Sequence, residues 1–335
     1  INSVLAKHIM ASKKGVKAVS NYFKIDLFVD RIFYSQDPAG TDTGRSATRE
    51  SEFFCGAQIQ NVPVYAKDIF IVDEGWELSA LDNSQSESRC TAYMSEDDNL
   101  MHTVETAADF HKTNASLFFG LPVDQITKPI RTLSKRTNHG ANYNMGASVM
   151  LDTMGARAVI EAKQLIGMPS WWGLLDVTAN LLQRFDLAYP DIKDKYYPEV
   201  IEEVNRTSML TGPTGWTRYT FMKLDLAASP DPSKAKSQKL NLNSLVAHGP
   251  QSLSVKLINK AMFLTWKRLQ IVENKIRMKA QVHDELMYMN RPEDRDYCAD
   301  VVSEFMALPC EVRGRTMIIP NDRVLGGKTW ADLKD

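Results

Sequence analysis

The sequence predicts an α+β fold in which helices flank an antiparallel sheet. Residues 275–290 (KIRMKAQVHDELMYMN) have the pattern of a strand, a two-residue turn and a second strand. Residues 67–82 (KDIFIVDEGWELSALD) predict a short strand, a Glu-Gly turn and a strand that ends at Asp82. Helical periodicity dominates the rest of the chain and is strongest over residues 251–272, which predict an amphipathic helix.

Composition sets the limits within which this fold must function. The chain has 335 residues, of which 44% are apolar and 24% charged, as in ordinary globular proteins. This length allows two or three domains, or one large domain with subdomains. The net charge of −1 excludes a global basic bias, so any nucleic-acid surface must be local. No apolar run approaches the roughly 18 residues of a membrane span, and we expect no membrane partner. Four cysteines are spread along the chain without a C-x-x-C pair, which predicts free thiols in a reducing compartment.

The N-terminal half is predicted to be mostly helical. Residues 1–25 predict a helix, and residues 37–50, which are rich in Gly, Pro and Asp, predict a loop. Helical patterns then cover residues 84–121, with a break near 95–99. Two or three further helices are expected over residues 123–167.

The C-terminal half mixes helices with irregular chain. Pro169 and Pro190 punctuate another helical region. Residues 210–250 are rich in Thr, Pro, Ser, Lys and Asn and predict irregular structure with a short hairpin at GWTRYTFM. Within them, Ser229–Ser237 is the segment that most resembles a loop. A helix over 293–307 and one final strand complete the prediction.

The first chemical motif lies at the predicted hairpin turn. His283 and Asp284 occupy the turn between two apolar strands, which lifts the aspartate out of the sheet. Hard divalent cations prefer such carboxylate oxygens. The alternative is that both are ordinary turn residues.

A second aspartate stands at the end of the other predicted strand. Asp82 precedes Ser84 and Glu87, which have the spacing of a helix capping box. Capping alone leaves Asp82 unexplained. If Asp82 and Asp284 meet at neighbouring strand ends, they could hold two metal ions about 4 Å apart. One ion would activate an attacking hydroxyl and the other would stabilise a leaving phosphate.

The third motif is a stripe of side chains on a predicted helix. Arg131, Lys135, His139 and Tyr143 are four residues apart, so a helix would align them on one face. The order of two cations and then two rings matches the phosphates, sugar and base of a nucleoside triphosphate. No acidic residue between 124 and 152 cancels this charge. The alternative is a solvated basic surface.

Together these segments resemble the family A DNA polymerases, the DNA polymerase I-like group. LDNSQSESR is similar to motif A (D-Y-S-Q-I-E-L-R), RTLSKRTNHGANYNMG to motif B (R-x3-K-x3-F/Y-G-x2-Y-G), and QVHDEL to motif C in its common form. Their order and separation also fit, and the resemblance runs from about residue 35 to the C-terminus. Shorter segments agree: TGR at Arg45 resembles T-G-R-x-S, QNVP at Gln60 resembles Q-N-I-P, ADFH at His111 resembles D-I-H, and Gln251 begins a helix similar to Q-G-T-A-A.

The resemblance implies a right-hand polymerase fold with an antiparallel-sheet palm, helical fingers and most of the thumb missing. It implies that 1–34 end the thumb or connector, 35–100 begin the palm, 101–210 form the fingers and 211–335 complete the palm. The chain starts without Met inside a thumb-like helix. We therefore expect a longer parent protein, or a thumb and exonuclease on a separate chain.

The resemblance also implies how the reaction is catalysed. Asp82 and Asp284 would bind two Mg²⁺ ions, for which Mn²⁺ could substitute, with the carbonyl of Asn83 as a further ligand. Glu285 would support them, and Lys135 would donate a proton to the leaving pyrophosphate. The reaction would be template-directed DNA synthesis in replication, in which a dNTP is added to a primer 3′-hydroxyl.

Further implied residues would bind the substrates. The nucleotide would contact Arg131, Lys135, His139, Tyr143, Glu87 and His111. Glu87 would crowd the sugar 2′ position, and Tyr143 would guard the template-base position. Primer-template DNA would contact Arg45, Gln60, Asn61, Gln251 and His283. Phosphates would supply most of the DNA affinity, which should fall with salt.

Departures from the family pattern carry their own expectations. His139 replaces a Phe or Tyr that is tied to the sugar 3′-hydroxyl, Asn83 replaces Tyr, and Asn144 replaces Gly. These differences predict a phage or viral member that acts in the cytoplasm of a bacterial host.

Three other functions are weighed against DNA synthesis. Glu87 and the H-D-E form of motif C argue against an RNA polymerase or a reverse transcriptase. A two-metal nuclease would have no use for the triphosphate stripe. A non-catalytic DNA-binding scaffold need not retain Asp82, Asp284 and Lys135 together.

Overall fold

The structure is a computed structural model that describes residues 31–38, 40–49, 59–165, 167–221, 223–224 and 232–333. The helix predicted over residues 1–25 lies outside this part of the chain. Two compact units are present. Unit 1 comprises residues 1–84, 255–308 and 319–335, and unit 2 comprises residues 85–254 and 309–318. Each unit is described by itself.

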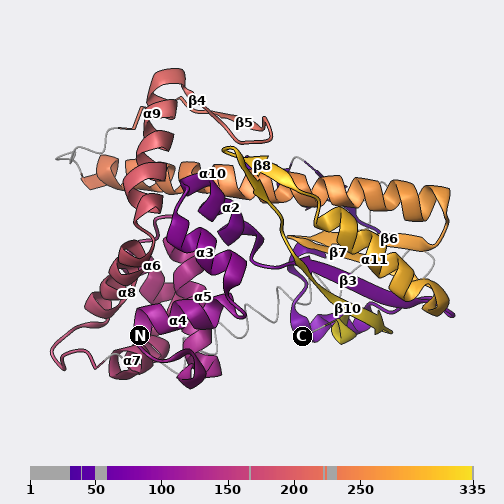
Figure 1. Cartoon of the computed structure of the whole chain (residues 1–335), viewed down its shortest axis with the longest axis horizontal. Coiled ribbons are helices and arrows are strands. Elements are labelled where there is room, and N and C mark those ends of the chain that lie inside the picture. Colours follow the sequence, from indigo (N-terminus) through magenta and orange to yellow (C-terminus); the bar gives the residue numbers. More distant parts are fainter. Residues whose placement is uncertain are drawn as a thin grey trace. The chain divides into compact units, whose positions relative to one another are not determined.

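Unit 1 is built on a four-stranded antiparallel sheet in the order β10-β3-β7-β6 (Figure 1). Its strands are β3 Glu77–Asn83, β6 Ile276–Val282, β7 Glu285–Asn290 and β10 Asn321–Gly327. The predicted strand, two-residue turn and strand over 275–290 is confirmed, as is the strand that carries Asp82. Antiparallel hairpins of this kind form from local sequence alone, which is why the pattern predicts them well.

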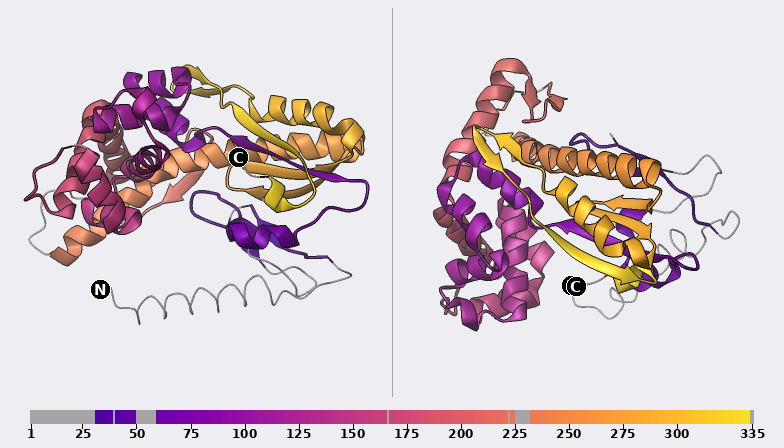
Figure 2. Two further views of the ribbon diagram at one scale, coloured as in Figure 1. Left: turned by 90° about the horizontal axis from the view of Figure 1, so that it is seen from below. Right: turned by 45° about the vertical axis from the view of Figure 1, so that its right-hand side comes forward.

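Both faces of this sheet are buried. Leu81, Leu286 and Tyr288 pack on one face against the end of α10 (Pro232–Thr265) and against α11 (Arg295–Met306). Figure 2 shows these two helices on the same side of the strands. Ala80 and Met287 point to the opposite face, where Trp330 lies in the core. Side chains of a strand alternate between faces, so both layers come from the same strands.

Two expectations for the start of unit 1 are wrong. Part of the predicted loop 37–50 is a strand, because β1 (Ser35–Asp37) pairs with β2 (Ala47–Arg49). The strand predicted from residue 67 is instead the 3₁₀ helix η3 (Val64–Ile69), with η2 (Ile59–Asn61) before it. This segment packs over Trp330 instead of pairing with a strand of the sheet. Phe70 meets its ring edge-on at 5.3 Å, and the Lys67 amine lies 4.5 Å from the ring centre.

Unit 2 is mainly helical. Its helices are α2 Ser86–Ser95, α3 Asp98–Thr106, α4 Phe110–Phe119, α5 Lys128–Ala141, α6 Ala147–Met154, α7 Ala156–Leu165, α8 Leu174–Ala188 and α9 Tyr197–Thr207. The predicted break near 95–99 is confirmed, with Glu96 in a left-handed conformation and Asp97 capping α3. Two or three helices are predicted over 123–167, and three are present as α5, α6 and α7. The short π-helix Ile192–Tyr196 leads into α9.

The largest error concerns residues 210–250, which are predicted to be irregular. The expected hairpin is present as β4 (Met209–Thr211) and β5 (Thr217–Tyr219), but helix α10 runs from Pro232 to Thr265. Part of the loop predicted at Ser229–Ser237 is therefore helical. Proline is well tolerated in a first helical turn. Leu242, Leu245 and Val246 are buried at helical spacing, which drives the helix despite its polar composition.

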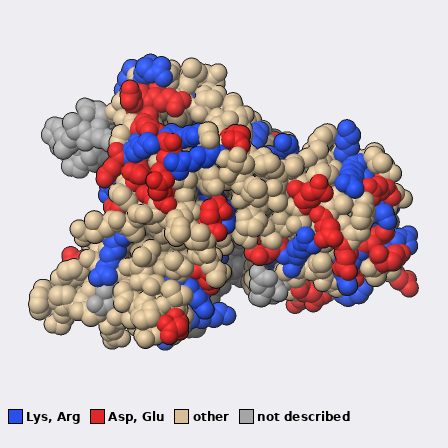
Figure 3. All heavy atoms as spheres, in the orientation of Figure 1, with Lys and Arg blue, Asp and Glu red and all other residues tan. Residues whose placement is uncertain are grey.

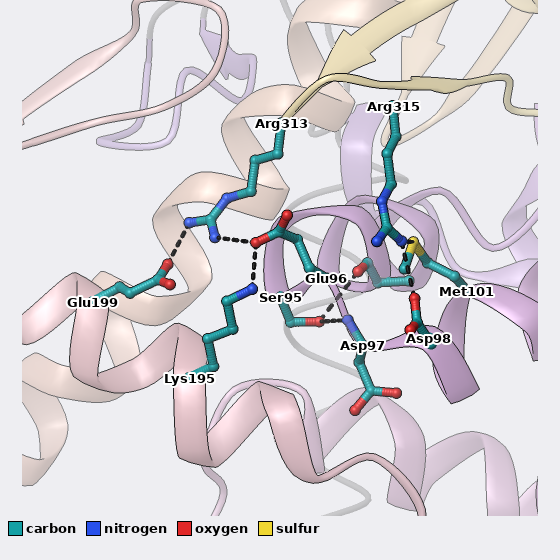
Figure 4. Close-up of polar contacts among 10 residues, drawn as sticks. Ser95, Glu96, Asp97, Asp98, Met101, Lys195, Glu199, Arg313 and Arg315 are labelled. Carbon is teal, nitrogen blue, oxygen red and sulfur yellow. Dashed lines mark hydrogen bonds and ion pairs between the residues drawn. The ribbon is translucent and has the colours of Figure 1, made fainter.

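The C-terminal segment contains more strands than the one predicted. Before β10, the chain forms a hairpin of β8 (Cys310–Val312) and β9 (Arg315–Met317) that belongs to unit 2. At its tip, Arg313 pairs with Glu199 at 2.5 Å and with Glu96 at 3.3 Å (Figure 4). Arg315 pairs with Asp98 at 3.0 Å. Ion pairs therefore attach this hairpin to the helices of its unit.

Surface and cysteine chemistry agree with the composition. Figure 3 shows acidic and basic side chains interspersed on the face in view, without a single-sign surface. Of the cysteines in the described residues, Cys90, Cys298 and Cys310 carry thiols that are not joined in disulfides, as predicted. None of the described helices has the length and apolarity needed to cross a membrane.

Candidate active site

The two aspartates predicted to meet do lie at neighbouring strand ends in unit 1. Strand β3 pairs with β7 so that Asp82 is opposite Glu285. The backbone NH of Asn83 donates to the carbonyl of Asp284 at 3.2 Å. Residues directly opposite in an antiparallel pair project to the same face. Asp82 and Glu285 therefore share one face of the sheet, and Asp284 lies in the adjoining turn between β6 and β7.

The turn that carries Asp284 has an unusual backbone. His283 has a φ of +57°, in the left-handed region that few residues other than Gly, Asn and Asp adopt readily. Burial raises the pKa of the Asp284 carboxyl, and a backbone hydrogen bond, the charges of His283 and Arg45 and a hydrogen bond with Asp82 offset this only in part. The pair suits a divalent cation, because the two carboxylates supply hard oxygen ligands and the cation would compensate their negative charges.

The residues predicted to bind DNA lie in different places. Arg45 is close enough to His283 to lower the pKa of its imidazole, although burial is the larger cause. The Gln60 side chain binds the backbone of the same turn, because its Oε1 accepts from the His283 NH at 3.3 Å. Asn61 is exposed at the end of η2. Gln251 is half-buried within α10 and does not begin that helix as predicted.

The predicted triphosphate stripe lies on α5 in unit 2. Lys135 and His139 are exposed, and Arg131 is half-buried with its Nε 2.7 Å from the Asp109 carboxylate. Tyr143 departs from the prediction because the helix ends at Ala141, so the helical stripe stops at His139. A turn follows, and the rings of His139 and Tyr143 still approach to 6.1 Å between centroids.

His111 lies close to the two cations of the stripe, Arg131 and Lys135. It lies in the first turn of α4, which packs against α5. Burial, followed by the charges of Lys135 and Arg131, lowers the pKa of His111 to about 4. The imidazole is therefore neutral near pH 7. The structure thus brings together the three side chains predicted to contact a triphosphate.

Glu87 does not form the capping box that was the alternative to a catalytic motif. The N-cap of α2 is Gln85, in a left-handed conformation and without a side-chain cap. The Ser84 hydroxyl instead donates to Asp322 at 2.7 Å. Glu87 accepts a hydrogen bond from the hydroxyl of Tyr143. Capping is therefore the wrong explanation for this segment.

Sequence reasoning missed two residues at the strand ends. Asp322 lies directly opposite Asp82 because β10 pairs with β3. A final strand was predicted, but nothing in its sequence indicates its partner. Gln281 is 2% exposed and bonds to the turn at His283. The signal for Gln281 in the sequence is its place just before the predicted turn, within the segment QVHDEL.

Comparisons with known proteins agree on the family. The sequence profile of DNA polymerase family A matches residues 2–330. The chain is 28% identical over 294 residues to the thermostable DNA polymerase I of Thermus aquaticus, covering 84% of this chain and 31% of the relative. It is 24% identical over 301 residues to DNA polymerase I of Bacillus caldotenax, covering 88% and 30%. These relatives are bacterial, and they lend no support to the predicted phage or viral origin.

A solved structure shares the fold. The POL domain of Pol1 from M. smegmatis, in complex with DNA primer-template and dNTP, superposes with a TM-score of 0.75 at 20% identity. The match covers 98% of this chain and 53% of that one. The chain spans about a third of the length of the curated relatives, since its match covers 31% of the Thermus aquaticus enzyme. Because the family profile covers nearly its whole length, the chain belongs to DNA polymerase family A.

Proposed function

We propose that this chain performs template-directed DNA synthesis, transferring a nucleotidyl group from a dNTP to a primer 3′-hydroxyl with release of pyrophosphate. The observation that carries the proposal is the pairing of β3 with β7, which places Asp82 opposite Glu285 and beside Asp284. The relatives are named DNA polymerase I, and the related structure holds primer-template and dNTP. We assign the sheet of unit 1 to the palm and the helices of unit 2 to the fingers.

Asp82, Asp284 and the Asn83 carbonyl would hold two Mg²⁺ ions, with Mn²⁺ as a substitute. These are hard oxygen ligands on adjacent strand ends, and they fit such ions. When bound, the ions stabilise negative charge that develops on the reacting phosphate. Glu285 supports the pair from the opposite position on β7. The protein's own part is to keep these oxygens in place before substrate arrives.

The face of α5 would hold the triphosphate. Lys135 and Arg131 neutralise its charge, and Lys135 donates a proton to the leaving pyrophosphate. His111 stays uncharged at pH 7 because its pKa is lowered to about 4, so it acts as a neutral hydrogen-bonding group. Glu87 fills the space beside the sugar 2′ carbon, and Tyr143 holds its carboxylate. His139 would face the sugar.

Primer-template DNA would be bound by several of the residues predicted for that role. Arg45, Asn61, Gln251 and His283 would contact the minor groove or the primer end, where acceptor positions are shared by all base pairs. Gln60 is already engaged with the turn at His283, so we assign it a supporting role. Replication in the cytoplasm of a bacterial cell completes the proposal.

Primer extension tests the proposal directly. A defined primer-template with Mg²⁺ is incubated with dNTPs, rNTPs or dideoxynucleotides, with Asp284→Ala as the control. Extension by dNTPs that the control lacks supports DNA synthesis. Salt-sensitive DNA binding without extension, in this chain and in a longer parent, would contradict it. The dideoxy lane reports what His139 does to sugar choice.

A further inference from the structure

We propose that Gln281 is a positioning residue that, together with Gln60, holds the His283–Asp284 turn in its left-handed shape and so aims the Asp284 carboxylate. The inference rests on the proposed function, because it assigns Asp284 to the reaction. It is carried by hydrogen bonds within unit 1 that involve both glutamine amides and the backbone of the turn.

Both polar ends of the Gln281 side chain form hydrogen bonds. It is 2% exposed, and its Nε2 donates to the carbonyl of His283 at 2.5 Å. Its Oε1 accepts from the Ser46 hydroxyl at 3.0 Å. A buried amide is costly unless both its donor and its acceptor are satisfied. Here the satisfied amide ties the turn to the segment that follows Arg45.

Gln60 bonds to the other backbone polar group of His283, its NH. Its Oε1 accepts from the His283 NH at 3.3 Å, and its Nε2 donates to the Gln281 carbonyl at 2.8 Å. The NH and the carbonyl of His283 are therefore both bonded to glutamine side chains. A non-glycine residue at a φ of +57° is strained, and such strain persists only where surrounding contacts enforce it.

The position of β6 in the sheet explains why side chains bond to its outer backbone groups. Strand β6 is at the edge of the sheet, with β7 as its neighbour, so its outer carbonyls have no strand partner. Gln36 also donates to the Gln281 carbonyl, at 2.7 Å, and Tyr34 donates to the Lys279 carbonyl two residues earlier. These bonds protect the strand edge, whereas the two bonds to His283 fix the turn. Removing the latter would let the turn relax and shift Asp284.

The test compares Gln281→Met with a matched control, a glutamine outside β6 whose side chain bonds to that strand. Met has a similar volume but neither a donor nor an acceptor of comparable strength. The control is Gln270→Met, because the half-buried Gln270 accepts from the Met278 NH at 2.7 Å near the other end of β6. Both variants lose one glutamine that supports β6, but only the first loses a bond to the turn.

Four quantities are measured on the full chain: kcat and KM for dNTP addition, the Kd for primer-template, and the Mn²⁺ affinity by electron paramagnetic resonance without DNA. Gln281→Met should lower kcat by roughly tenfold to a hundredfold, the range expected for a small displacement of a catalytic group. Its Mn²⁺ affinity should also fall, while the KM and the DNA Kd stay within about threefold. Gln270→Met should leave kcat and Mn²⁺ affinity unchanged.

Gln60→Met provides a second variant, because Gln60 is only half-buried and its loss need not prevent folding. It should reproduce both losses, and the double variant should lose less than the product of the two, as expected for residues that act on one turn. Unchanged kcat and Mn²⁺ affinity in Gln281→Met and Gln60→Met would overturn the proposal. Equal losses in Gln270→Met would also overturn it, because they would show a general effect on the sheet.

The Mn²⁺ measurement separates this inference from the proposed function. If the wild-type chain adds no nucleotide, the proposed function fails, yet loss of Mn²⁺ binding in Gln281→Met alone would still support the positioning role. If the wild type adds nucleotides and the variant matches it in every measurement, the proposed function stands and the positioning role fails.

Discussion

The hydroxyl of Tyr143 donates a hydrogen bond to the carboxylate of Glu87, which lies 56 residues earlier in the chain. The bond joins the residue proposed to guard the template base to the one proposed to exclude ribose. It lies within unit 2, close to the end of α5. Sugar choice and template reading would therefore share one contact.

Glu87→Ala should admit ribonucleotides. Removing the carboxylate opens the space beside the sugar 2′ carbon, and a single contact of this kind is worth about tenfold to a hundredfold in selectivity. The measurement is kcat/KM for a dNTP against the matching rNTP. Glu87→Gln is the control, since it keeps the volume and still accepts from Tyr143. Unchanged selectivity in Glu87→Ala would place the gate elsewhere.

Asp284→Asn should abolish nucleotide addition, with a loss of about a thousandfold or more in kcat, because a neutral amide is a poor ligand for a hard divalent ion. Binding of primer-template should survive. Asp300→Asn is a matched control on unit 1, since Asp300 is largely exposed and pairs with Arg323 at 2.6 Å. Near-normal turnover of Asp284→Asn would refute the metal assignment.

Lys135→Ala should raise the KM for dNTP and lower kcat, since the amine would both neutralise the triphosphate and protonate pyrophosphate. A loss of roughly a hundredfold in kcat/KM is expected for a proton donor of this type. The neighbouring Arg136 faces a different side of α5 and donates to the Met154 carbonyl at 3.1 Å. Arg136→Ala should therefore have little effect. Equal losses in both variants would indicate a general role for the charge of α5.

His111 should make the protein less stable in acid. Its pKa is lowered to about 4 by burial and by two nearby cations, whereas an unfolded histidine titrates near 6.5. The unfolded chain therefore binds the proton more tightly. The stability contributed by neutral His111 is complete above pH 6.5 and is lost as the pH falls from 6.5 to about 4.

Urea unfolding between pH 8 and pH 4 would measure this loss, which should be on the order of 2 kcal/mol given the partial exposure of the ring. His111→Gln should show a smaller acid loss than the wild type. His102→Gln serves as a control because His102 is exposed on α3. If the wild type and His111→Gln lose stability in parallel, the assigned pKa is wrong.

Arg313→Ala should loosen the β8–β9 hairpin (Figure 4). Arg313 bridges Glu96 and Glu199, and Lys195 also pairs with Glu96. Partly exposed pairs contribute about 1 kcal/mol when they form a network, and salt screens them. The thermal midpoint should therefore fall at low salt and converge with that of the wild type at high salt. A salt-independent loss would indicate packing instead.

The sequence alone determined the local parts of this molecule. The hairpin that carries Asp284, the strand that carries Asp82 and the face shared by Arg131, Lys135 and His139 all follow from periodicity between near neighbours. A strand or helix repeat spans only a few residues, so a short window contains the information. The same windows contained the motifs that indicated the family.

Only the tertiary structure decided which of these parts meet. β3 pairs with β7 and β10, more than 190 residues away, and Gln60 bonds to His283 across 223 positions. Helix α10 begins at Pro232 because apolar residues further along its face are buried, which its polar first turns do not reveal. Such contacts depend on packing between distant segments, which no short stretch of sequence encodes.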